Sequence, residues 1–222
     1  MSLLDDRALG KAKAVFKDNL VDEVNLIVFS QEFECPYCRQ VRELAEQLSA
    51  ISDRVRYCVY DLRRNSDKAS EYSIDKIPAI VVVGKRKYGI RFFGVPAGYE
   101  FLCLLEAVVD VSRNTSGISN SARTRIREVS KKVHIQVFTS PTNPYCYGVL
   151  RLAHQFAVEN ELIMADMVDS IMFPHLVNKY AVMAVPKVVI NESYQFVGDI
   201  VEQEFVDQVM VAVKATPDRL YI

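Results

Sequence analysis

The order of apolar and polar residues predicts alternating helices and strands in the first half of the chain. Apolar positions near a 3.6-residue spacing predict helices over about 3–16, 38–50, 67–72 and 98–112. Apolar or alternating runs predict strands over about 24–29, 55–61, 79–83 and 88–93. A turn over 84–87 joins the last two strands, so we expect them to form a β-hairpin.

The second half of the chain repeats this plan. A shift of 108 positions places Cys38 on Cys146 and Pro78 on Pro186, and it also aligns Pro36, Tyr37, Val41, Leu44 and Ala45 with Pro144, Tyr145, Val149, Leu152 and Ala153. A helix over 119–129 and a strand over 187–190 are expected at the matching places. A repeat this long indicates duplicated domains, because solenoid units are much shorter.

The polar, turn-rich segment 114–120 separates the two halves. We therefore expect one unit over 1–116 and a second over 117–222, and 222 residues are enough for each unit to bury its own core. Each unit runs βαβ, then a β-hairpin, then a helix. This order predicts an α/β fold in two tandem copies, each with a central mixed β-sheet flanked by helices.

Composition narrows the classes of partner. Half of the residues are hydrophobic, a quarter are charged and the formal net charge is −1, so nucleic-acid or membrane-surface binding has little electrostatic support. No apolar stretch approaches the ~18 residues that span a bilayer. The charged N-terminal segment lacks the apolar core of a secretory signal, so we expect a cytoplasmic protein.

Candidate chemistry is concentrated in the cysteines. There are five, an odd number, so they cannot all pair within the chain. Cys35 and Cys38 stand two residues apart between a predicted strand and a predicted helix, which favours a dithiol that opens and closes as a disulfide. Half of a zinc site and a purely structural disulfide are the alternatives, but zinc needs four ligands. Cys58 and Cys103 are isolated, and we expect both thiols to be buried and inert.

A cysteine at the first position of a helix meets unpaired N–H groups and the positive end of the helix dipole. Both favour a thiolate, so Cys35 is the predicted nucleophile, and Cys38, one turn deeper, is predicted to resolve the mixed disulfide. Pro36 suits the first helical turn because it lacks an N–H. Tyr37 is expected to form a flat rim. Of the nearby charges, Glu32 and Glu34 oppose the thiolate, whereas Arg39 and Arg42 support it.

Proline at the start of a predicted strand is the second shared feature. Ile77-Pro78 and Val185-Pro186 each lie 40 residues after the second cysteine position of their unit. A cis peptide bond at a loop-to-strand junction explains such a proline, and a trans proline at a strand start explains it too. The repetition of the feature favours cis.

Taken together, these motifs resemble the thioredoxin superfamily, and two units in one chain resemble the tandem protein disulfide oxidoreductases of thermophiles, also called glutaredoxin-like proteins. The resemblance covers nearly the whole chain and is carried by residues 89–98, 100–101, 109–113, 140–142, 144–146 and 182–187. It implies cis peptides before Pro78 and Pro186. It also implies thiol–disulfide exchange on protein substrates, with electrons from a thioredoxin-reductase-like flavoenzyme.

The second unit departs from that family at Asn143, where cysteine is usual. Pro144, Tyr145 and Cys146 are kept, as are Val185 and Pro186, so this altered site keeps only the shielded thiol. Asparagine caps a helix well, so we expect the helix to start normally without redox chemistry. A single-thiol role for Cys146, and its pairing with another thiol, are the alternatives.

We therefore predict a protein thiol–disulfide oxidoreductase in which Cys35 and Cys38 react, while Pro36, Tyr37, Ile77 and Pro78 shape the substrate groove. No metal and no bound cofactor are expected. A dedicated electron carrier to a peroxiredoxin-type partner is the first alternative. A chaperone-like protein-binding module is the second.

Overall fold

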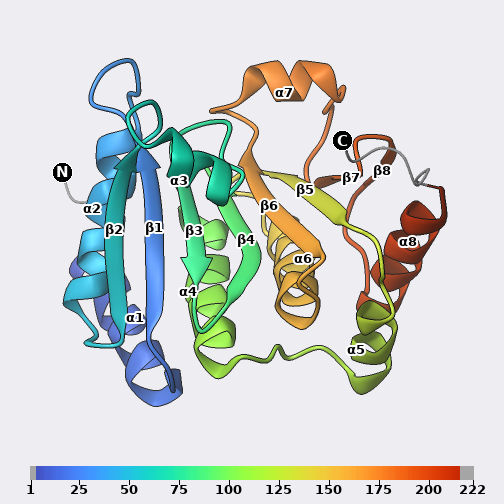
Figure 1. Cartoon of the computed structure of the whole chain (residues 1–222), viewed down its shortest axis with the longest axis horizontal. Coiled ribbons are helices and arrows are strands. Elements are labelled where there is room, and N and C mark those ends of the chain that lie inside the picture. Colours follow the sequence, from blue (N-terminus) through green and yellow to red (C-terminus); the bar gives the residue numbers. More distant parts are fainter. Residues whose placement is uncertain (1–3, 216–222) are drawn as a thin grey trace.

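The computed structural model describes residues 4–215, which form one eight-stranded sheet with helices on both faces (Figure 1). The first half contains α1 (Asp6–Asn19), β1 (Val24–Ser30), α2 (Cys38–Ala50), β2 (Val55–Asp61), α3 (Ser66–Glu71), β3 (Ala79–Val83), β4 (Lys87–Phe93) and α4 (Gly98–Arg113). The second half contains α5 (Asn120–Arg127), β5 (Val133–Thr139), α6 (Tyr145–Glu159), β6 (Ile163–Asp169), α7 (Pro174–Lys179), β7 (Lys187–Ile190), β8 (Tyr194–Val197) and α8 (Glu202–Ala215).

Each half contributes four strands in the same relative order. The sheet runs β2-β1-β3-β4-β6-β5-β7-β8, so β4 and β6 join the halves as a parallel pair. In each half the first two strands are parallel and the others antiparallel. These directions make β1 and β5 point the same way, and the segments that carry the two cysteine motifs therefore follow strands that end at one edge of the sheet.

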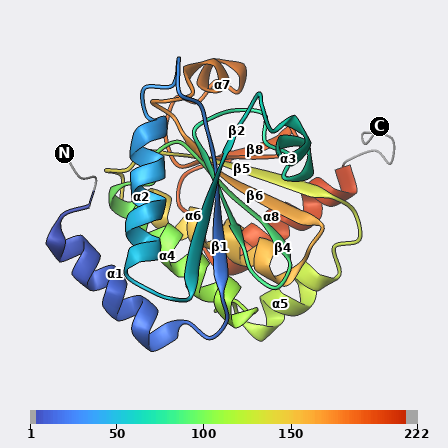
Figure 2. The same ribbon diagram turned by 60° about the vertical axis from the view of Figure 1, so that its left-hand side comes forward.

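The core lies on both faces of the sheet. The larger apolar cluster packs α1, α2, α4, α6 and α8 against one face, and a smaller cluster lies under α3 and α7 on the other. Figure 2 shows the sheet twisting between these layers. β1 and β5 are buried almost throughout because helices cover both sides, which explains their nearly continuous apolar sequences.

Helix ends account for the differences from the predicted elements. The first helix begins at Asp6 because the Asp5 carboxylate accepts a hydrogen bond from the N–H of Ala8 at 2.7 Å. Residue 3 of the predicted helix lies outside the described residues. Ser119 caps α5 in the same way, through the N–H of Ala122 at 3.2 Å. Between α4 and α5 the chain has no regular structure, and Asn114 ends α4 in a left-handed conformation.

Candidate functional site

Cys35 and Cys38 form a disulfide at the start of α2, with their Cα atoms 5.4 Å apart. The bond closes a tight turn in which the N–H of Cys38 donates to the carbonyl of Cys35 at 3.3 Å. The prediction that Cys35 is the first helical residue is wrong, because α2 begins at Cys38. Its first i−4 hydrogen bond runs from Val41 N–H to the carbonyl of Tyr37, so Cys35 belongs to the turn before the helix.

The two sulfurs differ in access to solvent. Cys38 is fully buried, whereas Cys35 is only partly buried and faces the rim of the site. Around it, Phe33 and Tyr37 are 76% and 40% exposed, which makes an aromatic border. An incoming thiol or disulfide therefore reaches Cys35 before Cys38.

Pro78 lies at the same edge of the sheet as the disulfide. Phe29 near the end of β1 pairs with Ala79 in β3, so the preceding Ile77-Pro78 peptide stands beside the segment that leads to Cys35. That peptide is cis, as the family resemblance implies. The carbonyl of Pro78 accepts a hydrogen bond from Gly94 N–H at 3.0 Å, which fixes the segment at the tip of β4.

The charges near Cys35 are mostly paired at the surface. Arg39 pairs with Glu43 at 3.3 Å, and Arg63 lies 3.9 Å from Glu34. Such exposed pairs are screened by solvent and have little effect on a thiolate. Arg42 differs, because it is half-buried and donates from Nη1 to the Ser30 hydroxyl at 2.6 Å.

The altered site in the second half has the same backbone and different chemistry. Cys146 N–H donates to the Asn143 carbonyl at 3.2 Å, which reproduces the turn of the first site. The Asn143 side-chain amide donates to the carbonyl of Val185 at 2.8 Å, and its oxygen accepts from Tyr145 N–H at 3.0 Å. Asn143 thus supports the start of α6 across Pro144, and it contacts the residue before the cis Pro186.

The three remaining cysteines are free. Cys146 and Cys103 are buried, and burial raises the pKa of each thiol, so neither ionises readily near neutral pH. The expectation that Cys58 is buried is wrong. Cys58 lies on β2, the edge strand of the sheet, and its side chain is only half-buried.

Glu100 is a site residue that the sequence analysis did not identify. It belongs to α4 of the first half but is 1% exposed beside the second site, where Thr139 donates to Oε1 at 2.6 Å. Burial raises its pKa to about 7, and the charge of Asp169 adds to the shift. Tyr99 N–H also bonds the carbonyl of Pro141, so α4 forms a wall of the second site. A lone carboxylate in an apolar helix was the available signal.

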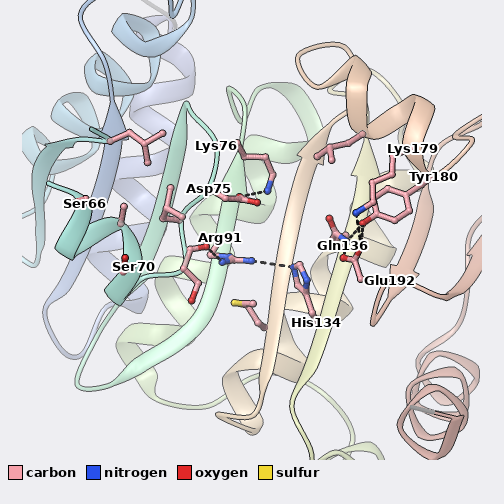
Figure 3. A pocket seen from close by; sticks show the side chains of 16 residues that line it. Ser66, Ser70, Asp75, Lys76, Arg91, His134, Gln136, Lys179, Tyr180 and Glu192 are labelled. Carbon is pink, nitrogen blue, oxygen red and sulfur yellow. Dashed lines mark hydrogen bonds and ion pairs between the residues drawn. The ribbon is translucent and has the colours of Figure 1, made fainter. Parts of the chain in front are cut away.

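A polar cleft of about 620 Å³ lies on the α3 and α7 face, between the two halves (Figure 3). Arg91 on β4 forms a two-point ion pair with the buried Asp166 on β6 at 2.7 Å, and His134 joins it at 2.6 Å. On the far wall Gln136, Tyr180 and Lys179 all bond Glu192 or each other. These charges neutralise one another, and the disulfide is not part of the cleft.

Among residues 4–215, no group of three His, Cys, Asp or Glu side chains is arranged to hold a metal ion. The same part of the chain contains no helix with the length and apolarity needed to cross a bilayer.

Comparisons with known proteins agree with this architecture. A model of the thioredoxin domain matches residues 133–211. A solved protein disulfide oxidoreductase from Aeropyrum pernix superposes with a TM-score of 0.88 at 28% identity, covering 96% of both chains. The alkylhydroperoxide reductase AhpF of Enterococcus faecalis superposes with a TM-score of 0.86 at 23% identity, covering 93% of this chain and 99% of that one, which indicates a shared fold.

Curated relatives are longer proteins. An alkyl hydroperoxide reductase of Staphylococcus aureus is 27% identical over 154 residues, which are 69% of this chain. A Bacillus subtilis protein named NADH dehydrogenase is 24% identical over 152 residues. The match spans only 28% of the length of each of these relatives.

Proposed function

We propose that this chain, which has the tandem thioredoxin fold, is a protein thiol–disulfide oxidoreductase whose reactive pair is Cys35 and Cys38. The observation that carries the proposal is the pairing of an accessible Cys35 with a fully buried Cys38 in one disulfide at a strand-to-helix turn. This arrangement gives one sulfur for attack from outside and one for release from inside.

The exchange transfers two electrons and needs no further reactant. In the reduced protein the Cys35 thiolate attacks a substrate disulfide, forms a mixed disulfide and expels one substrate thiolate. The Cys38 thiolate then attacks the Cys35 sulfur, which breaks the mixed disulfide and releases the second substrate thiolate. The substrate ends as a dithiol after protonation, and the protein ends as the Cys35–Cys38 disulfide. The reverse sequence oxidises a substrate dithiol.

Reduction of insulin disulfides by dithiothreitol, with and without the protein, tests this proposal. Cys35→Ser is expected to reduce turnover to the uncatalysed rate, because no exposed nucleophile remains. Cys38→Ser is expected to accumulate a covalent complex with the substrate that dithiothreitol releases. Full turnover by Cys35→Ser would contradict the assignment of the nucleophile.

For the second unit we propose a supporting role without redox turnover. Asn143 has no sulfur to attack, and Cys146 is buried with a raised pKa. We place the boundary between the two units after Ser116, in the irregular connection between α4 and α5.

A dedicated electron carrier is the second candidate function, and the similarity to the alkyl hydroperoxide reductase of Staphylococcus aureus favours it. In that case a thioredoxin-reductase-like flavoenzyme reduces Cys35–Cys38, and the dithiol then reduces a peroxiredoxin. Fast reduction of a peroxiredoxin combined with slow reduction of insulin would support this candidate. Three free thiols beside one disulfide suit a reducing compartment, so we place either activity in the cytoplasm.

A further inference from the structure

A pocket of about 490 Å³ opens beside the reactive disulfide, where the parallel strands β1 and β2 end. Its walls include Ser30 at the end of β1, Arg42 one turn beyond Cys38, and Asp61, Arg64 and Asn65 at the end of β2. We call it the guanidinium pocket. It lies on the β2 side of the disulfide, opposite the β3 side where Pro78 stands.

The two guanidinium groups of this pocket have no carboxylate partner within 4 Å among the described residues. Arg42 is held by the Ser30 hydroxyl, itself 2% exposed, through one of its five donors. Arg64 is exposed.

The acidic residues of the wall do not neutralise these arginines. The Asp61 carboxylate accepts hydrogen bonds from the backbone N–H groups of Arg63 and Arg64 at 2.9 and 2.8 Å. Those bonds hold the pKa of Asp61 below its usual value, with the Arg64 N–H as the largest cause. Glu32 also lines the pocket but belongs to the exposed loop before Cys35. The guanidinium donors therefore remain available to an incoming group.

The second unit has lost this pocket together with its reactive cysteine. Counting from Cys146 as from Cys38, Leu150 stands where Arg42 stands, and it is fully buried in the core. Counting from the end of β6 as from that of β2, Met172 replaces Arg64 and the buried Phe173 replaces Asn65. Within residues 4–215, the paired arginines accompany only the site that can exchange disulfides.

We propose that the guanidinium pocket is a specificity site that binds a carboxylate, from an Asp or Glu side chain near the target disulfide of a substrate polypeptide. A segment bound across Cys35 has Pro78 on one side and this pocket on the other, so residues next to the target cysteine reach it. Guanidinium and carboxylate form strong charge-assisted hydrogen bonds, and arginine matches carboxylate geometry better than lysine does. The inference rests on the oxidoreductase function proposed above.

Two sets of cystine-containing peptides test the site, one with Glu and one with Gln beside the cysteine, on either side in turn. The measured quantity is the second-order rate constant for reduction by the pre-reduced protein. Wild type is expected to prefer the better-placed Glu peptide by about 10-fold at low ionic strength, and less at high salt. In the Arg42→Gln, Arg64→Gln double variant the Glu/Gln ratio is expected to fall to about 1. The Lys double variant is expected to give an intermediate ratio.

The matched control is Arg39→Gln, Arg63→Gln, which removes two exposed arginines flanking the same disulfide and is expected to keep the wild-type ratio. A wild-type ratio near 1, or a ratio retained in Arg42→Gln, Arg64→Gln, would overturn the inference and leave the oxidoreductase function standing. Absence of reduction of every peptide by wild type would instead overturn the proposed function, and this inference with it.

Discussion

The side-chain amide of Asn143 donates a hydrogen bond to the carbonyl of Val185 at 2.8 Å, and this contact joins the altered turn to the residue before the cis Pro186. The first site has cysteine at this place and uses its sulfur to bond Cys38 instead. One residue thus decides whether the turn closes on the helix or on the neighbouring loop.

Asn143→Cys is expected to create a second disulfide with Cys146, because the backbone turn at this site already matches that of Cys35 and Cys38. Wild type has three free cysteines beside its disulfide. The oxidised variant should therefore show two free thiols by reagent titration in denaturant. A count of four would mean that the new pair stays open. Asn143→Ser is the control and should show three.

Glu100 makes folding stability depend on pH near neutrality. Its pKa is raised to about 7 in the folded protein, so its contribution is fully present below the usual value of 4.5 and is lost as the pH rises through 7. Glu100→Gln is expected to remove about 2–3 kcal/mol of this loss, as measured by urea unfolding between acidic and mildly alkaline pH. Glu204→Gln, in the exposed first turn of α8, should leave the wild-type profile unchanged.

His154 acts at acid pH with the opposite sign. It is fully buried against Phe92, with ring centroids 4.6 Å apart, and burial lowers its pKa to about 3. The unfolded chain binds the proton first, so stability falls as the pH drops below about 6.5, by roughly 1.4 kcal/mol per pH unit. His154→Leu should flatten that part of the urea-unfolding profile. The exposed His175→Leu should not, and an equal change in both variants would contradict this prediction.

Arg91 and Asp166 connect the two halves through a buried ion pair. Asp166→Asn leaves the arginine buried with a weaker partner, and it is expected to lower the free energy of unfolding by about 3 kcal/mol. Replacing both residues with Leu should cost less than Asp166→Asn alone, because no uncompensated charge remains. Lys68→Ala, which breaks an exposed pair with Glu71, should cost less than about 1 kcal/mol in the same chemical denaturation assay.

Much of the fold was predictable because its signals are local. The limits predicted for α2, β2 and β3 agree with the structure, since apolar spacing and turn residues mark them. The start of α1 was misplaced because its cap, Asp5, lies outside the apolar pattern. The fold class and the disulfide follow from the repeat and from the spacing of Cys35 and Cys38.

The contacts that cross between the halves were not predictable in this way. Glu100 reaches Thr139, 39 residues away, and Arg91 reaches Asp166, 75 residues away. Periodicity reports how one element is buried and carries no information about which distant element covers it. The guanidinium pocket has the same origin, because it forms only when the ends of β1 and β2 come together.

The parallel joint between β4 and β6 turns the two sites into a molecular ruler. β1 and β5 are separated by β3, β4 and β6, which gives four strand spacings of ~4.8 Å and therefore a distance of roughly 19 Å between the two strand tips. An extended polypeptide covers that distance with about six residues. A client that touches both units must therefore offer two anchor points about that far apart, and the rigid sheet between them fixes the interval.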